Sequence, residues 1–85
     1  MSKIEIYYKG YCPYCRKAKA LLDSKGVEYT LYDVTDDAEK QAEMTKRTGG
    51  ARTVPQIFVD DVNLGGCDDI HRLDKQGKLN AMIGL

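Results

Sequence analysis

The stretch Tyr11-Cys12-Pro13-Tyr14-Cys15-Arg16 decides the fold, because it joins a predicted strand to a predicted helix. The run Ile4-Glu5-Ile6-Tyr7-Tyr8 before it alternates and is rich in residues that favour strands. Proline suits the first position of a helix, since its missing N–H would have no intrahelical partner there. The pattern therefore puts Cys12 at the N-terminus of a helix and Cys15 one turn further along, on the same face.

A Cys-x-x-Cys motif in this position is typical of redox chemistry. The positive end of the helix dipole favours the thiolate of Cys12, which is the form that attacks disulfides. Lys9, at the end of the preceding strand, can lower the pKa of Cys12 and bind an anionic substrate. The helical spacing also lets Cys12 and Cys15 form a disulfide. We therefore expect Cys12 to be the nucleophile and the deeper Cys15 to resolve its adducts.

Length and composition set limits on the class of protein. The 85 residues suffice for one domain spanning residues 1–85, and 13 basic residues balance 13 acidic ones, so the chain lacks the basic field that nucleic-acid binding needs. No apolar run approaches the ~20 residues of a membrane span, and no signal peptide is expected before the first strand. Three cysteines do not suit a secreted disulfide scaffold. We expect a monomeric, reduced, cytoplasmic protein without a membrane or nucleic-acid partner.

Hydrophobic periodicity and turn residues predict an α/β chain in the order β-α-β-α-β-β-α. The first two strands should be parallel, joined by a right-handed crossover, and Asp60-Asp61 should form the turn of a hairpin. The stretch Lys78–Leu85 is a tail that can add a last turn of helix. The predicted strands are residues 3–8, 27–33, 54–59 and 62–64, and the predicted helices are 13–25, 37–47 and 68–76.

Two further motifs offer binding groups. In Thr53-Val54-Pro55, a cis bond before the proline would turn the backbone N–H and C=O of Val54 outward, toward an extended peptide-like ligand; the isomer stays open from the residues alone. In Gly65-Gly66-Cys67-Asp68-Asp69, the start of a helix leaves N–H groups free for an anion, and Asp68 could hold an ammonium group. The two together suit an amino-acid head group, while the alternative is a turn with an aspartate cap.

Structural and metal interpretations stand beside the redox one. Cys12 and Cys15 could be buried structural residues. With Cys67 and His71 they could also ligate zinc, although Cys15 runs into a helix rather than a glycine-bearing knuckle. His71 is otherwise a surface residue of a helix. Cys67 is either a small residue at a helix start or an auxiliary thiol.

On these three motifs the chain resembles the glutaredoxin family, in its short dithiol form with Cys-Pro-Tyr-Cys. It is most similar to the small bacterial glutaredoxin 3 type, which also carries a cysteine after Gly-Gly. The resemblance runs almost end to end. It implies a thioredoxin fold, with a four-stranded mixed sheet packed between helices, and it implies that the Val54–Pro55 bond is cis.

The resemblance also implies glutathione as a co-substrate, with no permanently bound cofactor and no metal. Lys9 and Gln41 would take the glycyl carboxylate, Val54 would pair with the cysteinyl part, and Asp68 would take the γ-glutamyl ammonium. The loop Thr48–Arg52 is one residue longer than is usual for the family, so Lys40, Lys46 and Arg47 are alternatives to Gln41. The full predicted glutathione site is Lys9, Tyr14, Gln41, Thr53, Val54, Pro55, Gly66, Cys67 and Asp68.

The implied activity is glutathione-dependent thiol–disulfide exchange in cell redox homeostasis and electron transport. Cys12 alone would reduce protein–glutathione mixed disulfides, and Cys12 with Cys15 would reduce protein disulfides. Two alternatives remain open. One is a thioredoxin-like reductase that is fed by a flavoprotein and does not use glutathione. The other is a module that binds zinc or an iron–sulfur cluster between two chains.

Overall fold

The central feature of the fold is a mixed sheet of four strands. The computed structural model describes residues 2–85. The strand order is β2-β1-β3-β4, with β1 parallel to β2 and antiparallel to β3, and with β3 antiparallel to β4. The elements follow the predicted order, with one added short helix: β1 Ile4–Tyr8, α1 Pro13–Ser24, β2 Thr30–Asp33, α2 Ala38–Thr48, β3 Gln56–Val59, β4 Val62–Gly65, α3 Cys67–Lys75 and α4 Leu79–Met82.

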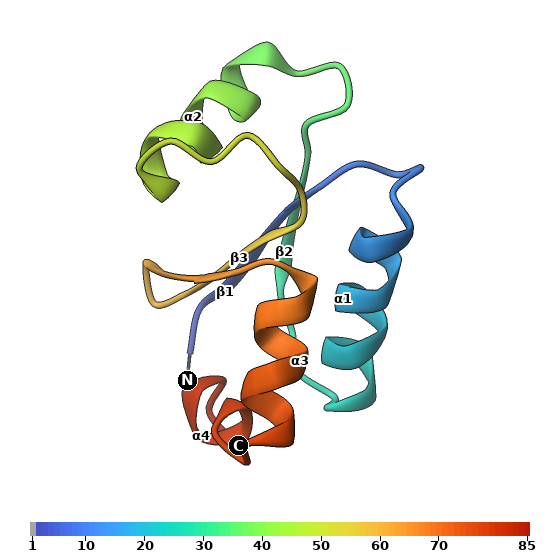
Figure 1. Ribbon diagram of the computed structural model, residues 1–85, viewed down its shortest axis with the longest axis vertical. Coiled ribbons are helices and arrows are strands. Elements are labelled where there is room, and N and C mark those ends of the chain that lie inside the picture. The colour runs from blue at the N-terminus through green and yellow to red at the C-terminus, as the bar shows by residue number, and fades with distance from the viewer. Residues whose placement is uncertain (1) are drawn as a thin grey trace.

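Helices cover both faces of this sheet (Figure 1). Successive residues of β1 point to opposite faces. Ile4 and Ile6 therefore pack with residues of α1, α3 and α4, while Tyr7 packs with Met44 of α2 on the other face. The predicted α/β architecture is confirmed as a thioredoxin-type fold.

The predicted bounds of three strands were too wide, those of β1 by one residue and those of β2 and β3 by more. β2 begins at Thr30, which pairs with Glu5; Val27 and Tyr29 pack against the core but lie outside the ladder. β3 begins at Gln56, so Val54 and Pro55 form a loop before it. An apolar residue can be buried without joining a ladder, and alternation alone does not separate these cases.

The ends of the helices are set by local chemistry. The side chain of Asp37 caps α2 by accepting a hydrogen bond from the Lys40 N–H at 3.0 Å, and Gly49 ends this helix with a φ of 78°. α3 begins at Cys67, one residue before its predicted start. The C-terminal tail contains the short helix α4.

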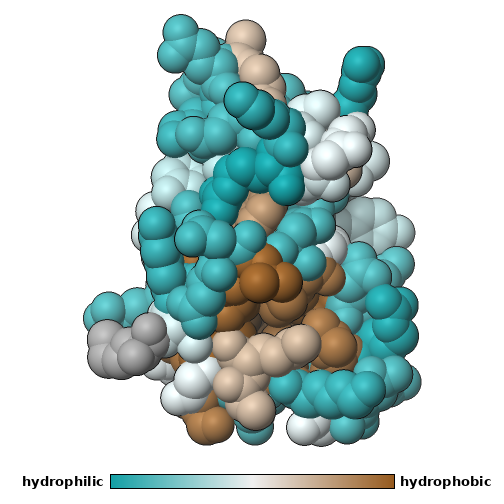
Figure 2. Space-filling view, turned by 90° about the vertical axis from the view of Figure 1, so that its left-hand side faces the viewer, coloured by the Kyte–Doolittle hydropathy of each residue, from teal (hydrophilic) through white to brown (hydrophobic). Residues whose placement is uncertain are grey.

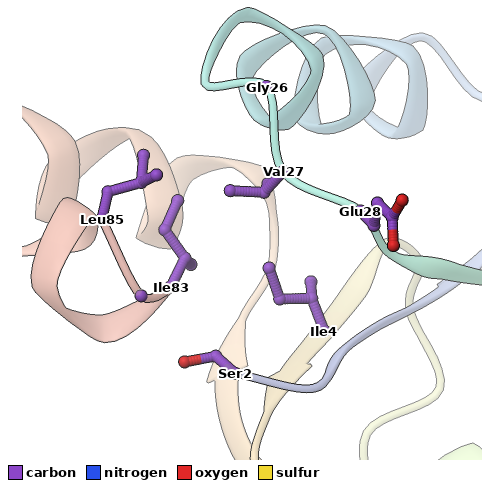
Figure 3. A pocket seen from close by; sticks show the side chains of 8 residues that line it. Ser2, Ile4, Gly26, Val27, Glu28, Ile83 and Leu85 are labelled. Atoms are coloured by element: carbon purple, nitrogen blue, oxygen red, sulfur yellow. The ribbon is translucent and has the colours of Figure 1, made fainter.

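Two surface features lie away from the cysteine motif. A hollow of about 400 Å³ lies at the C-terminal end of α1, where Ile4, Val27, Ile83 and Leu85 come together (Figure 3). Hydrophobic residues also gather on the side of the molecule at left in Figure 1, below α2 (Figure 2). None of the helices within residues 2–85 has the length and apolar character that crossing a membrane requires.

Candidate active site

The turn between β1 and α1 presents Cys12 at the surface. Cys12 is the N-cap of α1 and Pro13 follows as its first residue, while the Cys12 N–H donates to the Lys9 carbonyl at 3.1 Å. The Cys12 side chain is partly exposed, whereas Cys15 is only 1% exposed. The Cys12 Sγ also lies 3.9 Å from the Val54 carbonyl oxygen, so the thiol reaches the loop that precedes β3.

The environment of the two cysteines separates their acidities. Burial opposes ionisation of Cys12, but hydrogen bonds from Cys15 and from the backbone of Tyr14 and Cys15, together with the charge of Lys9, outweigh it and lower the pKa of Cys12. Burial is the largest of the effects that raise the pKa of Cys15, to about 12. This environment therefore favours ionisation of Cys12 over that of Cys15.

Alkylation should report this difference directly. We expect iodoacetamide to label Cys12 alone in the reduced native protein at pH 7. The pH midpoint of its labelling should lie below that of an ordinary cysteine, because the thiolate is the reactive form. Peptide mapping by mass spectrometry gives the site, and a pH series gives the midpoint. Lys9→Gln should raise the midpoint, whereas Lys78→Gln, at an exposed distant position, should not. Equal labelling of Cys12 and Cys15 would contradict the assignment.

One groove, of about 170 Å³, joins the second and third motifs beside Cys12. The Val54–Pro55 bond is cis, as the family resemblance implied. Val54 packs on the apolar cluster under α2, which anchors this loop. The predicted residues that the groove brings together are Tyr14, Thr53, Val54, Pro55, Gly66, Cys67 and Asp68, and Asp69 joins them.

The two aspartates of the third motif have different roles. The Gly66 N–H donates to Asp69 Oδ2 at 2.8 Å, so Asp69 caps α3, whereas Asp68 is exposed on the groove. A side chain at Gly65, whose φ is 101°, would put its Cβ 2.3 Å from that same oxygen. The N–H groups of Cys67 and Asp68 lie in the first turn and have no partner within the helix. An anion at the start of α3 would therefore meet these two N–H groups, whereas the Gly66 N–H is already occupied by Asp69.

A second groove, of about 480 Å³, lies between the end of β1 and the start of α2. Lys9 and Gln41, which the family resemblance implied for a carboxylate site, both line this groove, and Arg52 lines it with them. Sequence reasoning missed Arg52 as a site residue. Its position directly before Thr53-Val54-Pro55 was an available signal.

The alternatives to Gln41 are engaged elsewhere or lie further out. Lys40 pairs with Glu43 at 3.1 Å and lies 4.4 Å from the centre of the Tyr32 ring. Lys46 lines a neighbouring groove with Gln41 and Arg52. Arg47 is directed into the interface between α2 and the sheet.

Arg47 is the centre of a polar network under α2. Its guanidinium donates two hydrogen bonds of 3.1 Å to the carboxylate of Glu5, whose side chain is 4% exposed, and one of 2.9 Å to the Tyr7 hydroxyl. It also lies 4.0 Å from the centre of the Phe58 ring. The hydrogen bond from Arg47 is the largest effect on the pKa of Glu5, which is lowered despite burial. Arg47 thus holds α2, the helix that contains Gln41, against the sheet.

The third cysteine lies beside a histidine. Cys67 Sγ is 3.5 Å from His71 Nδ1, and the same nitrogen is 2.8 Å from the Cys67 carbonyl oxygen. Burial raises the pKa of the Cys67 thiol. Within residues 2–85, the structure forms no group of three or more His, Cys, Asp or Glu side chains placed to hold a metal ion.

Comparison with known proteins identifies the relatives of this chain. The glutaredoxin family model matches residues 4–63. Glutaredoxin 3 of Escherichia coli (strain K12) is 49% identical over 83 residues, covering 98% of this chain and 99% of that protein. Glutaredoxin 1 of Rickettsia prowazekii is 47% identical over 81 residues, covering 94% and 85%.

Two solved structures of glutaredoxins have folds similar to that of this chain. The buckwheat glutaredoxin–glutathione complex matches with a TM-score of 0.86 and 32% identity, over 96% of this chain and 76% of that one. The solution structure of a glutaredoxin from Brucella melitensis matches with a TM-score of 0.82 and 44% identity, over 95% and 87%. With its paired thiols at the start of α1, the chain therefore belongs to the glutaredoxin family of thiol–disulfide oxidoreductases.

Proposed function

We propose that this protein is a glutathione-dependent reductase that acts on protein–glutathione mixed disulfides and on protein disulfides. The observation that carries the proposal is the position of Cys12, whose sulfur meets the Val54 carbonyl beside a groove that ends in Asp68. Lys9 and Arg52 line a second groove on the other flank of the motif. Glutathione has a carboxylate at one end, a peptide-like middle and an amino-acid head group at the other end. The groups that line the two grooves match these three parts.

The proposed pose places glutathione across Cys12. The glycyl carboxylate is bound by Lys9, Arg52 and Gln41, and the backbone of Val54 pairs with the cysteinyl part. At the other end, the first-turn N–H groups of α3 take the γ-glutamyl carboxylate. The Asp68 carboxylate takes its ammonium group. The complex of the structurally similar buckwheat glutaredoxin with glutathione supports this proposal.

The mixed-disulfide cycle needs one cysteine. The Cys12 thiolate attacks the glutathione sulfur of the substrate, the disulfide breaks, and the target thiolate leaves and takes up a proton. The thiolate of a second glutathione then attacks the glutathione sulfur held on Cys12. Oxidised glutathione is released and the Cys12 thiolate returns, so one disulfide is consumed and one is formed.

Protein disulfides need both cysteines. The Cys12 thiolate attacks one sulfur of the target and forms an intermolecular disulfide. Cys15, deprotonated, attacks the Cys12 sulfur and releases the reduced target. Two molecules of glutathione then reduce the Cys12–Cys15 disulfide. This chemistry needs a reduced glutathione pool, and we propose a cytoplasmic protein that works as a monomer.

Glutathione dependence is the decisive test. We expect glutathione alone, regenerated by glutathione reductase and NADPH, to reduce the oxidised protein. Lys9→Gln and Arg52→Gln should each raise the KM for glutathione about five-fold, the scale of one lost charge-assisted contact at a partly or fully exposed site. Lys75→Gln, at an exposed position in the last turn of α3, is the matched control. Failure of glutathione to reduce the protein, with reduction by a thioredoxin-type flavoprotein, would overturn the proposal.

A further inference from the structure

We propose that this protein prefers substrates whose reacting cysteine is flanked by acidic residues, and that they dock on a surface formed by Tyr11, Tyr14, Arg16 and Lys17. We call these four residues the docking surface. The inference rests on the proposed function, because it concerns the polypeptide that carries the mixed disulfide to Cys12.

The first observation is that two cations beside Cys12 form no salt bridge in the part of the chain that the structure describes, although Lys17 lines a hollow with Asp68. Arg16 and Lys17 are exposed, and neither forms a salt bridge within residues 2–85. The first turn of α1 contains no acidic residue, and Asp23, two turns from Arg16, accepts a hydrogen bond from Tyr29. In a chain of zero net charge, the start of α1 is therefore locally cationic. The salt-bridged cations lie elsewhere: Lys25, Lys40, Arg47 and Arg72.

The second observation is an exposed aromatic pair at the same place. Tyr11 is 66% exposed and Tyr14 is 57% exposed, on either side of Cys12 and Pro13. The Lys17 Nζ lies 5.9 Å from the centre of the Tyr14 ring. Exposed tyrosine beside cationic side chains offers both apolar area and polar contacts, a composition enriched in protein interfaces.

The third observation concerns which side of Cys12 is free. Tyr14 lines the groove assigned to the γ-glutamyl end, but Tyr11 and Arg16 line neither groove assigned to glutathione. Arg16 Nη2 lies 3.4 Å from the Gly10 carbonyl oxygen, so the guanidinium is held beside the turn that leads into Cys12. A substrate polypeptide that extends from Cys12 in the direction away from the glutathione grooves therefore contacts Tyr11 and Arg16.

Charge then determines which polypeptide fits. Glutamate or aspartate next to the reacting cysteine would place a carboxylate near Arg16 or Lys17, while lysine there would be repelled. Complementary charge raises the rate of encounter and fixes the orientation of the partner. Each exposed pair contributes little by itself, so the preference should be moderate and should decline with ionic strength.

Two synthetic peptides test the inference. Each carries one glutathionylated cysteine in the same sequence, flanked by glutamates in one peptide and by lysines in the other. We expect the wild-type protein to reduce the acidic peptide with a kcat/KM about five-fold higher at low ionic strength, and we expect the ratio to approach one in high salt. The ratio is the readout because any change in the reactivity of Cys12 affects both peptides equally.

Charge variants connect the preference to these residues. The double variant Arg16→Gln, Lys17→Gln should bring the ratio close to one, and Arg16→Glu should favour the basic peptide. The matched control Lys75→Gln, Lys78→Gln removes the same charge from exposed positions around the end of α3 and should keep the wild-type ratio. Equal rates for the two peptides in the wild type, or an unchanged ratio in the Arg16 and Lys17 variant, would overturn the inference.

The same assay separates this inference from the proposed function. A mixed disulfide of cysteine and glutathione has no flanking residues and serves as the reference substrate. If it is reduced while the two peptides do not differ, only the docking inference fails. If neither it nor either peptide is reduced by glutathione, the proposed function fails and the inference fails with it.

Discussion

Replacing Cys12 with serine is expected to abolish reduction of glutathionylated substrates, by about 10³-fold or more, because a serine hydroxyl does not ionise at neutral pH and forms no disulfide. Cys15→Ser should instead keep this activity within about two-fold, since the mixed-disulfide cycle does not consume Cys15. Cys15→Ser should lose the reduction of protein disulfides. A coupled assay with glutathione, glutathione reductase and NADPH measures both reactions on both variants.

The two variants control for each other. Both replace a sulfur with an oxygen at the start of α1, and thermal unfolding of each shows whether the fold is kept. Substantial turnover by a folded Cys12→Ser protein would mean that Cys15 or Cys67 is the nucleophile. A folded Cys15→Ser protein without mixed-disulfide activity would show that the second thiol is needed in every cycle.

Replacing Arg47 with methionine should lower the free energy of unfolding by about 3 kcal/mol, a large fraction of the roughly 5–15 kcal/mol typical of a domain. The Glu5 carboxylate, 4% exposed, would lose a bidentate partner and remain buried, and among residues 2–85 only the Tyr32 hydroxyl would still donate to its side chain. The expected loss is at the lower end for a broken buried pair, because Arg47 itself keeps 24% exposure. Urea unfolding measures it.

Two further variants test whether the loss of stability in Arg47→Met comes from the buried ion pair. Arg72→Met removes a mostly exposed partner of Asp69 and should cost less than about 1 kcal/mol. The double variant Glu5→Met, Arg47→Met leaves no charge buried and should regain much of the loss. An Arg47→Met protein as stable as Arg72→Met would contradict the role of the network.

The network also predicts how stability depends on pH. Because the pKa of Glu5 is lowered in the folded protein, with the hydrogen bond from Arg47 as the largest cause, the contribution is fully present above the unfolded pKa of a glutamate. It is lost as the pH falls through the lower, folded pKa. The free energy of unfolding of Arg47→Met should therefore fall less on acidification than that of the wild-type protein.

Local patterns in the sequence were sufficient for the order of elements and for most of the site. Proline after Cys12 identifies the start of α1, and Gly49 marks the end of α2, because helix starts and ends depend on neighbours in the chain. The cap of α2 is Asp37, whereas the sequence predicted Thr35 or Asp36, because several adjacent residues can serve as a cap. The residues of the groove beside Cys12 were found through motifs in the same way. The roles proposed for them in binding glutathione remain to be tested.

Long-range contacts explain what the sequence did not reveal. Glu5 alternates with isoleucine and tyrosine as a solvent-facing residue would, yet Arg47, 42 positions later, holds it buried. Because this long-range pairing is not visible in the sequence, Arg47 was predicted as an alternative ligand for the glycyl carboxylate of glutathione. Arg52 joins Lys9 and Gln41 only because the loop after α2 returns to the sheet. Such pairings depend on tertiary structure, which periodicity does not encode.

The contact between the two active-site sulfurs has a consequence for the order of events. Besides burial, the hydrogen bond and the charge of Cys12 help to raise the pKa of Cys15. When Cys12 has formed a disulfide with a target, that charge is gone and Cys15 ionises more readily. The first reaction therefore prepares the second, and Cys15 stays protected from stray oxidants until Cys12 is engaged. In the proposed cycle, burial of Cys15 would slow its attack on the intermolecular disulfide, so glutathione would compete with Cys15 for that bond.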